Sequence, residues 1–335
     1  MNKKLADLIR LLQDKSADLP GSKQLAALSA LRPDEQTLLR EAWGGVADEK
    51  RLDLLVTLVE ISEADASSDF GAVFRMALED ADEEVRLSAL EGLWDDDDEE
   101  LAAVLLQLMA ADPSVAVRAS AAINLGRFAM LGELEEISPQ TTSLVRKALV
   151  GAIRSPQQDT EVRRRALESA SCMSGDDIAG LIRAAYREKD ERMTVSAVFS
   201  MGRSLDEEWA PYVRRELKNA RPEIRLEAAR AAGELELSDA LPELLEMLHD
   251  PEPEVRDAVI EALGNIGSER ALQILGELAH SDDDSTRYAA LDALEVARFN
   301  EDPLSPEVLS WLFDREIVEW DLEDDSDDED DEEDA

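Results

Sequence analysis

Cysteine, histidine and aromatic residues are all scarce in this chain of 335 residues. The single cysteine, Cys172, excludes an intrachain disulfide, and it excludes a metal site built on several thiolates. Aromatic residues make up only 4% of the chain, whereas hydrophobic residues make up 44%, so the core must consist mainly of Leu, Ala, Val and Ile. Ala and Leu are strong helix formers, while strands favour β-branched and aromatic residues. The composition therefore favours helices over strands.

Basic residues are also few. The chain has 35 Lys and Arg against 78 Asp and Glu, which gives a formal net charge of −43. Binding to nucleic acid or to an anionic membrane surface requires Lys and Arg that face phosphate, so we expect neither as a direct partner. The negative charge serves solubility, and it leaves a basic protein as one candidate partner.

Long hydrophobic runs are missing. The longest nearly apolar run, Leu101 to Ala111, is too short to span a bilayer and contains Gln107. Near the N-terminus, Asp7 and Arg10 interrupt what would be the apolar region of a signal peptide. We therefore expect a cytoplasmic protein that does not enter a membrane.

A repeat of 31 residues runs through most of the chain. Its most constant feature is an arginine, here called the register residue, which recurs every 31 residues from Arg163 to Arg287 with Thr194 as the aligned exception. In several units an acid or amide stands six residues before it, and a glycine stands eight residues after it. The register residues are Arg51, Arg86, Arg118, Arg163, Thr194, Arg225, Arg256 and Arg287; the polar residues are Asp80, Asp112, Glu188, Asn219 and Asp250; the glycines are Gly126, Gly202, Gly233 and Gly264.

One unit shows why each repeat should be a helical hairpin. Leucines at helical spacing predict a first helix over residues 240–248, and Asp250-Pro251 ends it because proline cannot continue a helix. Pro253 suits the first turn of a second helix. Each hairpin has two apolar stripes, and both are buried only when neighbouring hairpins stack. Stacking also sets the acid of the turn and the arginine of the second helix in rows, which predicts a ladder of polar contacts between repeats.

At these residues the chain resembles the HEAT repeat family, particularly the short bacterial form named after phycobilin-lyase HEAT-like repeats. The resemblance is carried by the Asp-Pro-x-x-x-Val-Arg-x-x-Ala motif at Asp112 to Ala121, by a partial copy at Asp250 to Val259, and by the trailing Gly126 and Gly264. It covers about residues 76 to 298. It implies an all-α fold, a right-handed α-solenoid or α-α superhelix, whose second helices line a concave face that binds a partner. It does not imply an enzyme.

The ends of the chain depart from the repeat. We expect an N-terminal helical cap over residues 1–46, the repeat array over 47–300, a C-terminal capping helix over 301–320, and a disordered acidic tail over 321–335. The tail holds twelve acids and no base, and such a block repels itself. It serves either solubility or the binding of a basic surface, so an acidic chaperone or nucleic-acid mimic is an alternative function.

Two local departures lie inside the array. The step from Arg118 to Arg163 is 45 residues, and the surplus of 14 falls near residues 130–143. Either a functional loop or a longer helix pair accounts for it. The acidic run Asp95 to Glu100 lacks the spaced ligands and the turn glycine of an EF-hand loop, and we interpret it as a solvated turn whose last two acids, Glu99 and Glu100, suit the start of the next helix.

Catalytic motifs are missing. Two histidines, His249 and His280, stand one repeat apart, and neither is followed by glutamate. Deoxyhypusine hydroxylase, a HEAT-type enzyme, holds its iron in repeated His-Glu pairs, so this activity is not expected. No motif of a pigment lyase, no phosphate-binding loop and no Gly-x-Ser-x-Gly turn is present. We therefore expect no enzyme activity, no cofactor and no metal.

The leading hypothesis is a monomeric scaffold or adaptor that binds another protein on its second helices. Exposed positions one and five residues after the register residue are the candidate contacts, because they vary between units while the core stays constant. Random drift of a surface predicts the same variation. The candidate protein-binding residues are Arg164, Glu168, Leu226, Arg230, Asp257, Glu261, Tyr288 and Asp292.

Overall fold

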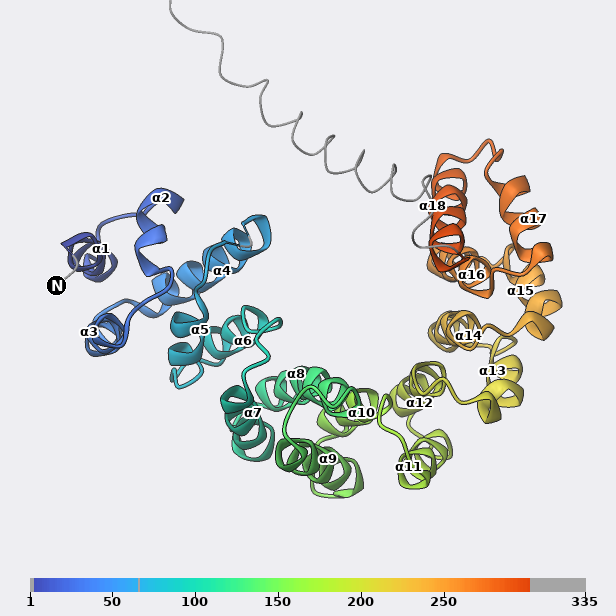
Figure 1. The fold of residues 1–335 in the computed structure, drawn as a ribbon, viewed down its shortest axis with the longest axis horizontal. Coiled ribbons are helices and arrows are strands. Elements are labelled where there is room, and N and C mark those ends of the chain that lie inside the picture. The colour runs from blue at the N-terminus through green and yellow to red at the C-terminus, as the bar shows by residue number, and fades with distance from the viewer. Residues whose placement is uncertain (1–2, 66, 302–335) are drawn as a thin grey trace, which may run out of the picture. The chain divides into compact units, whose positions relative to one another are not determined.

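The computed structural model describes residues 3–65 and 67–301, and over this part of the chain every regular element is a helix (Figure 1). The predicted all-α fold is therefore confirmed. The helices are α1 (Lys3–Gln13), α2 (Ser22–Leu25), η1 (Ala26–Leu28), α3 (Pro33–Trp43), α4 (Asp48–Ala64), α5 (Gly71–Ala77), α6 (Glu83–Glu91), α7 (Glu99–Ala111), α8 (Val115–Glu133), α9 (Pro139–Arg154), α10 (Thr160–Ala170), α11 (Asp176–Tyr186), α12 (Glu191–Arg203), η2 (Glu207–Trp209), α13 (Ala210–Glu216), α14 (Pro222–Glu234), η3 (Ser238–Ala240), α15 (Leu241–Met247), α16 (Pro253–Ile266), α17 (Glu269–Leu278) and α18 (Asp284–Glu301).

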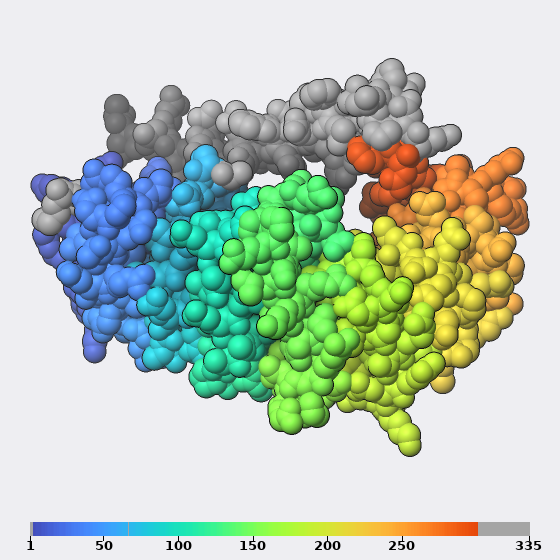
Figure 2. Space-filling view, turned by 60° about the horizontal axis from the view of Figure 1, so that its bottom comes forward, coloured from blue at the N-terminus to red at the C-terminus, as the bar shows by residue number. Residues whose placement is uncertain are grey.

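The chain divides into two compact units, unit 1 (Met1–Ala197) and unit 2 (Val198–Ala335). Within each unit, consecutive hairpins lie side by side, so the colour changes gradually along the surface of each unit (Figure 2). The predicted boundaries at residues 46 and 300 stay predictions. The capping helix expected over 301–320 and the acidic tail over 321–335 lie, apart from residue 301, outside the described residues.

Each repeat is a hairpin whose second helix packs on the second helices of its neighbours. In unit 1, α8 packs on α6 and α10; in unit 2, α16 packs on α14 and α18 (Figure 1). The apolar stripe predicted for the second helix of one unit is buried, because Val255, Val259 and Leu263 face the core. Such stacking buries both stripes of a hairpin.

Neighbouring repeats are joined by the predicted ladder. The guanidinium of Arg86 donates two hydrogen bonds of 2.9 Å to the carboxylate of Asp112 in the next repeat, and Arg225 donates two of 2.7 Å to Asp250. Each arginine also donates to the backbone carbonyl six residues before it in its own repeat. Further rungs of the ladder are Arg51 with Asp80 and Arg163 with Glu188. The prediction of polar rows between repeats is confirmed.

The recurring glycine allows two second helices to approach closely. A Cβ atom added to Gly233 would lie 2.7 Å from the Cα atom of Ala262, a distance that real side chains do not show. The partner residue stands six positions after the register residue of the next repeat, and it is alanine or serine each time. The pairs are Gly126 with Ser169, Gly202 with Ala231, Gly233 with Ala262, and Gly264 with Ala293. The spacing of these glycines was visible in the sequence, but this contact was not.

The N-terminal helices join the array through the ladder. α1 buries Leu5, Leu8, Ile9 and Leu12 along one side, and α3 begins at Pro33. The indole Nε1 of Trp43, at the end of α3, donates a 2.6 Å hydrogen bond to Asp80, which also accepts from Arg51. Asp80 therefore connects the first helices to the first repeat arginine.

The surplus residues near 130–143 lengthen a helix pair and do not form a long loop. α8 has 19 residues and α9 has 16, and only residues 134–138 connect them. Of the two alternatives for this segment, the longer helix pair is the one present. Glu99, at the start of α7, accepts hydrogen bonds from Ser138 and Thr141 at the start of α9, and these bonds hold its pKa below the usual value.

The acidic run over residues 95–100 is more than a solvated turn. Asp96 accepts hydrogen bonds of 2.6–2.9 Å from Arg75 of α5, and Asp98 caps α7 by accepting from the backbone of Glu100. Asp95 pairs with Arg127 of α8 at 3.4 Å. Four of the six acids are exposed, so the turn is solvated as predicted, but arginines of α5 and α8 also reach the run.

Candidate protein-binding face

The candidate residues lie on one face of four second helices. They occupy the first and fifth positions after the register residue on α10, α14, α16 and α18. Residues four apart on a helix lie on the same side, one turn above the other, so each helix presents its pair together. We call these positions the second-helix face.

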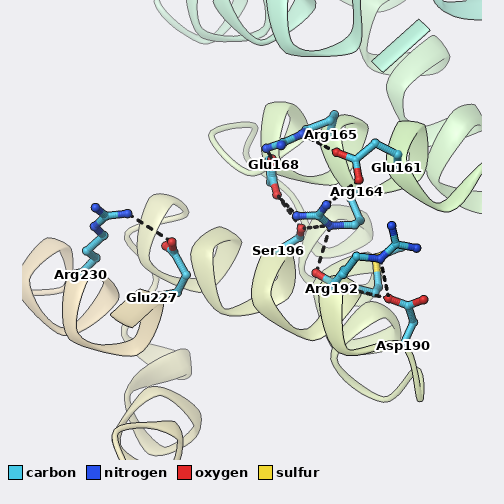
Figure 3. Close-up of polar contacts among 10 residues, drawn as sticks. Glu161, Arg164, Arg165, Glu168, Asp190, Arg192, Ser196, Glu227 and Arg230 are labelled. Carbon is cyan, nitrogen blue, oxygen red and sulfur yellow. Dashed lines mark hydrogen bonds and ion pairs between the residues drawn. The ribbon is translucent and has the colours of Figure 1, made fainter. Parts of the chain in front are cut away.

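On α10 both candidate side chains already have interaction partners within the protein (Figure 3). Arg164 pairs with Glu161 at 2.6 Å and donates a 3.0 Å hydrogen bond to the hydroxyl of Ser196 on α12. Glu168 accepts from the same hydroxyl and from Arg165. The side chains of Arg164 and Glu168 are only 12% and 16% exposed, so the expectation that they are exposed is wrong. Opposite charges on adjacent turns pair, and Ser196 completes the network.

On α14 the face is partly covered. Leu226 is half-buried, and Arg230 donates a 3.2 Å hydrogen bond to Glu227 of the same helix (Figure 3). Burial raises the pKa of Glu234 above the usual range, and the carboxylates of Glu227 and Glu261 raise it further, against the opposing effect of Arg203 and Arg230. Burial is the main cause of the rise, and carboxylates of α14 and α16 add to it.

Between α16 and α18 the face forms a groove of about 210 Å³. Asp257, Glu261 and Asp292 are among the residues that line it, and none of the described lining residues is basic. Within the described residues none of the three forms an ion pair. The floor is apolar and is formed by Ala289, Ala293 and Val296. The structure thus brings three of the eight candidate residues to one apolar groove with an acidic rim.

Tyr288 lies on the exposed side of α18, where 63% of it is accessible to solvent. The guanidinium of its neighbour Arg287 lies 5.3 Å from the ring centroid. Val296, which sequence reasoning did not select, is also exposed and belongs to the same helix. Its signal was present in the sequence, since it stands nine residues after the register residue, one helical turn beyond the position of Asp292.

Over residues 3–65 and 67–301, no cluster of three or more His, Cys, Asp and Glu side chains is placed to hold a metal ion. The Nδ1 atom of His280, in the turn after α17, lies 2.8 Å from the carbonyl of Gly276 in the last turn of that helix. None of the helices in this part of the chain is long and apolar enough to cross a bilayer.

Helical hairpins that stack through their second helices define an α-solenoid. The sequence pattern of HEAT repeats matches residues 72–171 and 210–295, which together make up more than half of the chain. The chain therefore belongs to the HEAT repeat family, as its residues predicted.

Solved structures with similar folds are distant in sequence. YibA of Escherichia coli shares 19% identity over 73% of this chain and 97% of its own, with a TM-score of 0.44. The CpcE–CpcF complex of phycocyanin lyase from Nostoc sp. shares 18% over 58% of this chain and 76% of its own, with a TM-score of 0.42. Kap95p, in a structure with RanGDP, shares 15% over 87% of this chain, with a TM-score of 0.48, and this chain spans 45% of Kap95p. No curated protein matches the sequence.

Proposed function

We propose that this protein is a non-catalytic scaffold that binds a basic, extended segment of another protein on the second-helix face of unit 2. HEAT repeats are compatible with such a role. The scaffold is expected to act as a cytoplasmic monomer. The observation that carries the proposal is the groove between α16 and α18, which is lined by apolar residues and by three acids that form no ion pair with the described residues.

The chemistry of the groove selects its occupant. A lysine or arginine side chain carries a long aliphatic stem and a charged head, so its stem would cover the alanines while its head meets a carboxylate. Asp257, Glu261 and Asp292 would each be able to accept from such a head. Tyr288, largely exposed beside the groove, adds an aromatic surface of the kind that contributes strongly to interfaces.

A charge-reversal experiment tests the proposal. The variant with Asp257→Lys, Glu261→Lys and Asp292→Lys should bind a fluorescein-labelled peptide of alternating lysine and leucine about tenfold more weakly than the parent, measured by fluorescence anisotropy, because opposed charges repel at close range. The matched control reverses three acids of the first-helix layer, with Asp239→Lys, Glu246→Lys and Glu269→Lys. Equal losses in both variants would falsify a specific groove, since only the overall charge would then matter.

The acidic tail supplies a separate comparison. Removal of residues 321–335 deletes twelve acids and none of the residues that line the groove. The scaffold proposal expects the shortened chain to bind the same peptide as the full chain does. Loss of binding on truncation would instead support the alternative, an acidic chaperone or nucleic-acid mimic that acts through its tail.

A further inference from the structure

A second groove lies in unit 1, where α6 ends early. α6 has 9 residues and stops at Glu91, whereas its neighbour α8 has 19. The space beyond the end of α6 is part of an open groove of about 1210 Å³. Its lining includes Glu63 of α4, the turn after α6, and Ser120 and Asn124 of α8. The groove shares no residue with the one between α16 and α18.

Trp94 stands in this groove and is 52% exposed. The turn that carries it is fixed on both sides. Gly92 packs against the ring of Phe74 so closely that a Cβ atom would lie 2.4 Å from its Cζ atom, and Leu93 is fully buried. The backbone N–H of Trp94 donates a 3.1 Å hydrogen bond to the carbonyl of Glu91. The fold thus holds the backbone of a large aromatic residue at the surface.

The charge of the groove is one-sided. Six carboxylates and two guanidinium groups line it, a surplus of four negative charges. Both arginines already have partners, because Arg75 pairs with Asp96 and Asp98, and Arg40 pairs with Glu79 at 2.7 Å. Among the described residues, four of the lining acids form no ion pair, and these are Glu63, Asp69, Glu91 and Glu100. The described lining residues hold no further cation that would balance these acids.

We propose that this groove is a docking site for a basic segment of a partner protein, and that Trp94 receives a lysine or arginine side chain of that segment. The face of a tryptophan ring attracts a cation more strongly than the other aromatic side chains do, and the surrounding carboxylates add to the attraction. Tryptophan is also enriched among the residues that dominate binding energy. A nucleic acid does not fit, because its phosphates would meet a surplus of negative charge. The site goes beyond the scaffold proposal, because it lies in unit 1 and does not depend on the groove of unit 2.

Direct contact is tested by ¹⁹F NMR of the full chain labelled with 5-fluorotryptophan. The chain has five tryptophans, and the resonance of Trp94 is assigned as the one that disappears in the variant Trp94→Phe. A peptide of alternating lysine and serine should shift the Trp94 resonance, while the resonance of the buried Trp209 should stay in place. A peptide that binds without moving the Trp94 resonance would overturn the proposal.

Affinity variants separate this site from general attraction to an acidic protein. Trp94→Ala should weaken binding of the same peptide about fivefold. Trp94→Phe should weaken it less, since phenylalanine keeps a weaker aromatic face. Leu134→Ala is the matched control, because Leu134 is an exposed apolar residue of unit 1 that does not line the groove, and it should bind as the parent does. Equal losses in Trp94→Ala and Leu134→Ala would overturn the proposal.

The role of charge has its own control. Acetylation of every lysine in the peptide removes the charge and keeps the length. Binding of the acetylated peptide should no longer depend on Trp94. If it binds as well as the charged peptide and still depends on Trp94, the groove is an apolar docking site and the assignment to a cation is wrong. The effect of Trp94→Ala should persist in the charge-reversed unit 2 variant, so failure of one groove remains distinguishable from failure of the other.

Discussion

Asp112 of one repeat accepts two parallel hydrogen bonds of 2.9 Å from Arg86 of the repeat before it, and both side chains are almost fully buried. The same carboxylate accepts a 2.9 Å hydrogen bond from the backbone N–H of Ser114, which caps α8. One acid therefore serves both the link between two repeats and the turn inside its own repeat.

Replacement of this acid should be costly. Asp112→Asn leaves the guanidinium of Arg86 buried without a charged partner, and loss of one member of a buried pair costs about 3 kcal/mol in the free energy of unfolding. Urea denaturation measures this loss in the free energy of unfolding. The control is Asp7→Asn, because the pair of Asp7 with Arg10 is exposed and such pairs contribute less than about 1 kcal/mol. Similar losses in the two variants would show that the ladder adds no more than a surface contact.

The close approach of α14 and α16 gives a prediction about glycine. Gly233→Ala places a Cβ atom 2.7 Å from the Cα atom of Ala262, so the helices must separate, and the expected loss is about 2 kcal/mol. Gly276 of α17 has no neighbour within 4 Å of such an atom, and Gly276→Ala should raise stability by about 0.5 kcal/mol because alanine restricts the unfolded chain. Thermal denaturation should therefore shift in opposite directions. A gain in both variants would contradict the helix contact.

Acid should weaken one rung of the ladder. Hydrogen bonds from Arg225 hold the pKa of Asp250 below its usual value. A lowered pKa stabilises the fold above the pKa of the unfolded chain, about 4, and this contribution is lost as the pH falls through the folded value. Asp250→Asn should be less stable at pH 7, and its stability should fall less steeply below pH 4. Urea denaturation across this pH range measures how steeply the stability falls. As a control, Asp239→Asn should show the same pH dependence as the parent.

Glu234 should show the opposite sign. Burial raises its pKa, so its contribution to stability is present below the unfolded pKa, about 4.3, and is lost as the pH rises through the folded value. Glu234→Gln removes the cost of a buried charge, and it should be more stable than the parent at pH 7 and similar to it at pH 4. Denaturation of parent and variant at the two pH values tests this prediction. A less stable variant at pH 7 would mean that the carboxylate is needed by Arg203 or Arg230.

The features that every repeat shares were readable from the sequence. The arginine at the register position and the acid six residues before it recur, so a role between repeats could be inferred, and Arg225 with Asp250 shows that role. Burial of Arg164 and Glu168 was not readable, because it depends on Ser196 of the next repeat. The groove between α16 and α18 depends on contacts between two helices, and a pattern along one helix does not contain them.

The acidic run near Asp96 shows the same limit. Six adjacent acids read as a solvated turn when only their neighbours in sequence are considered. The partner of Asp96 is Arg75, which comes from another helix of the same repeat. The early end of α6 that leaves Trp94 at the surface is likewise a matter of helix length relative to a neighbour, and it has no signal in the composition of the turn itself.

The ladder divides the charges of this protein into two classes that differ in how strongly they respond to ionic strength. Pairs such as Arg86 with Asp112 lie away from solvent, where dissolved ions screen them little. The surplus acids lie mainly at the surface, where they repel one another through water and are screened well. Added salt therefore removes repulsion without weakening the links between repeats. A chain with a formal net charge of −43 should consequently hold together better in concentrated salt than in dilute buffer.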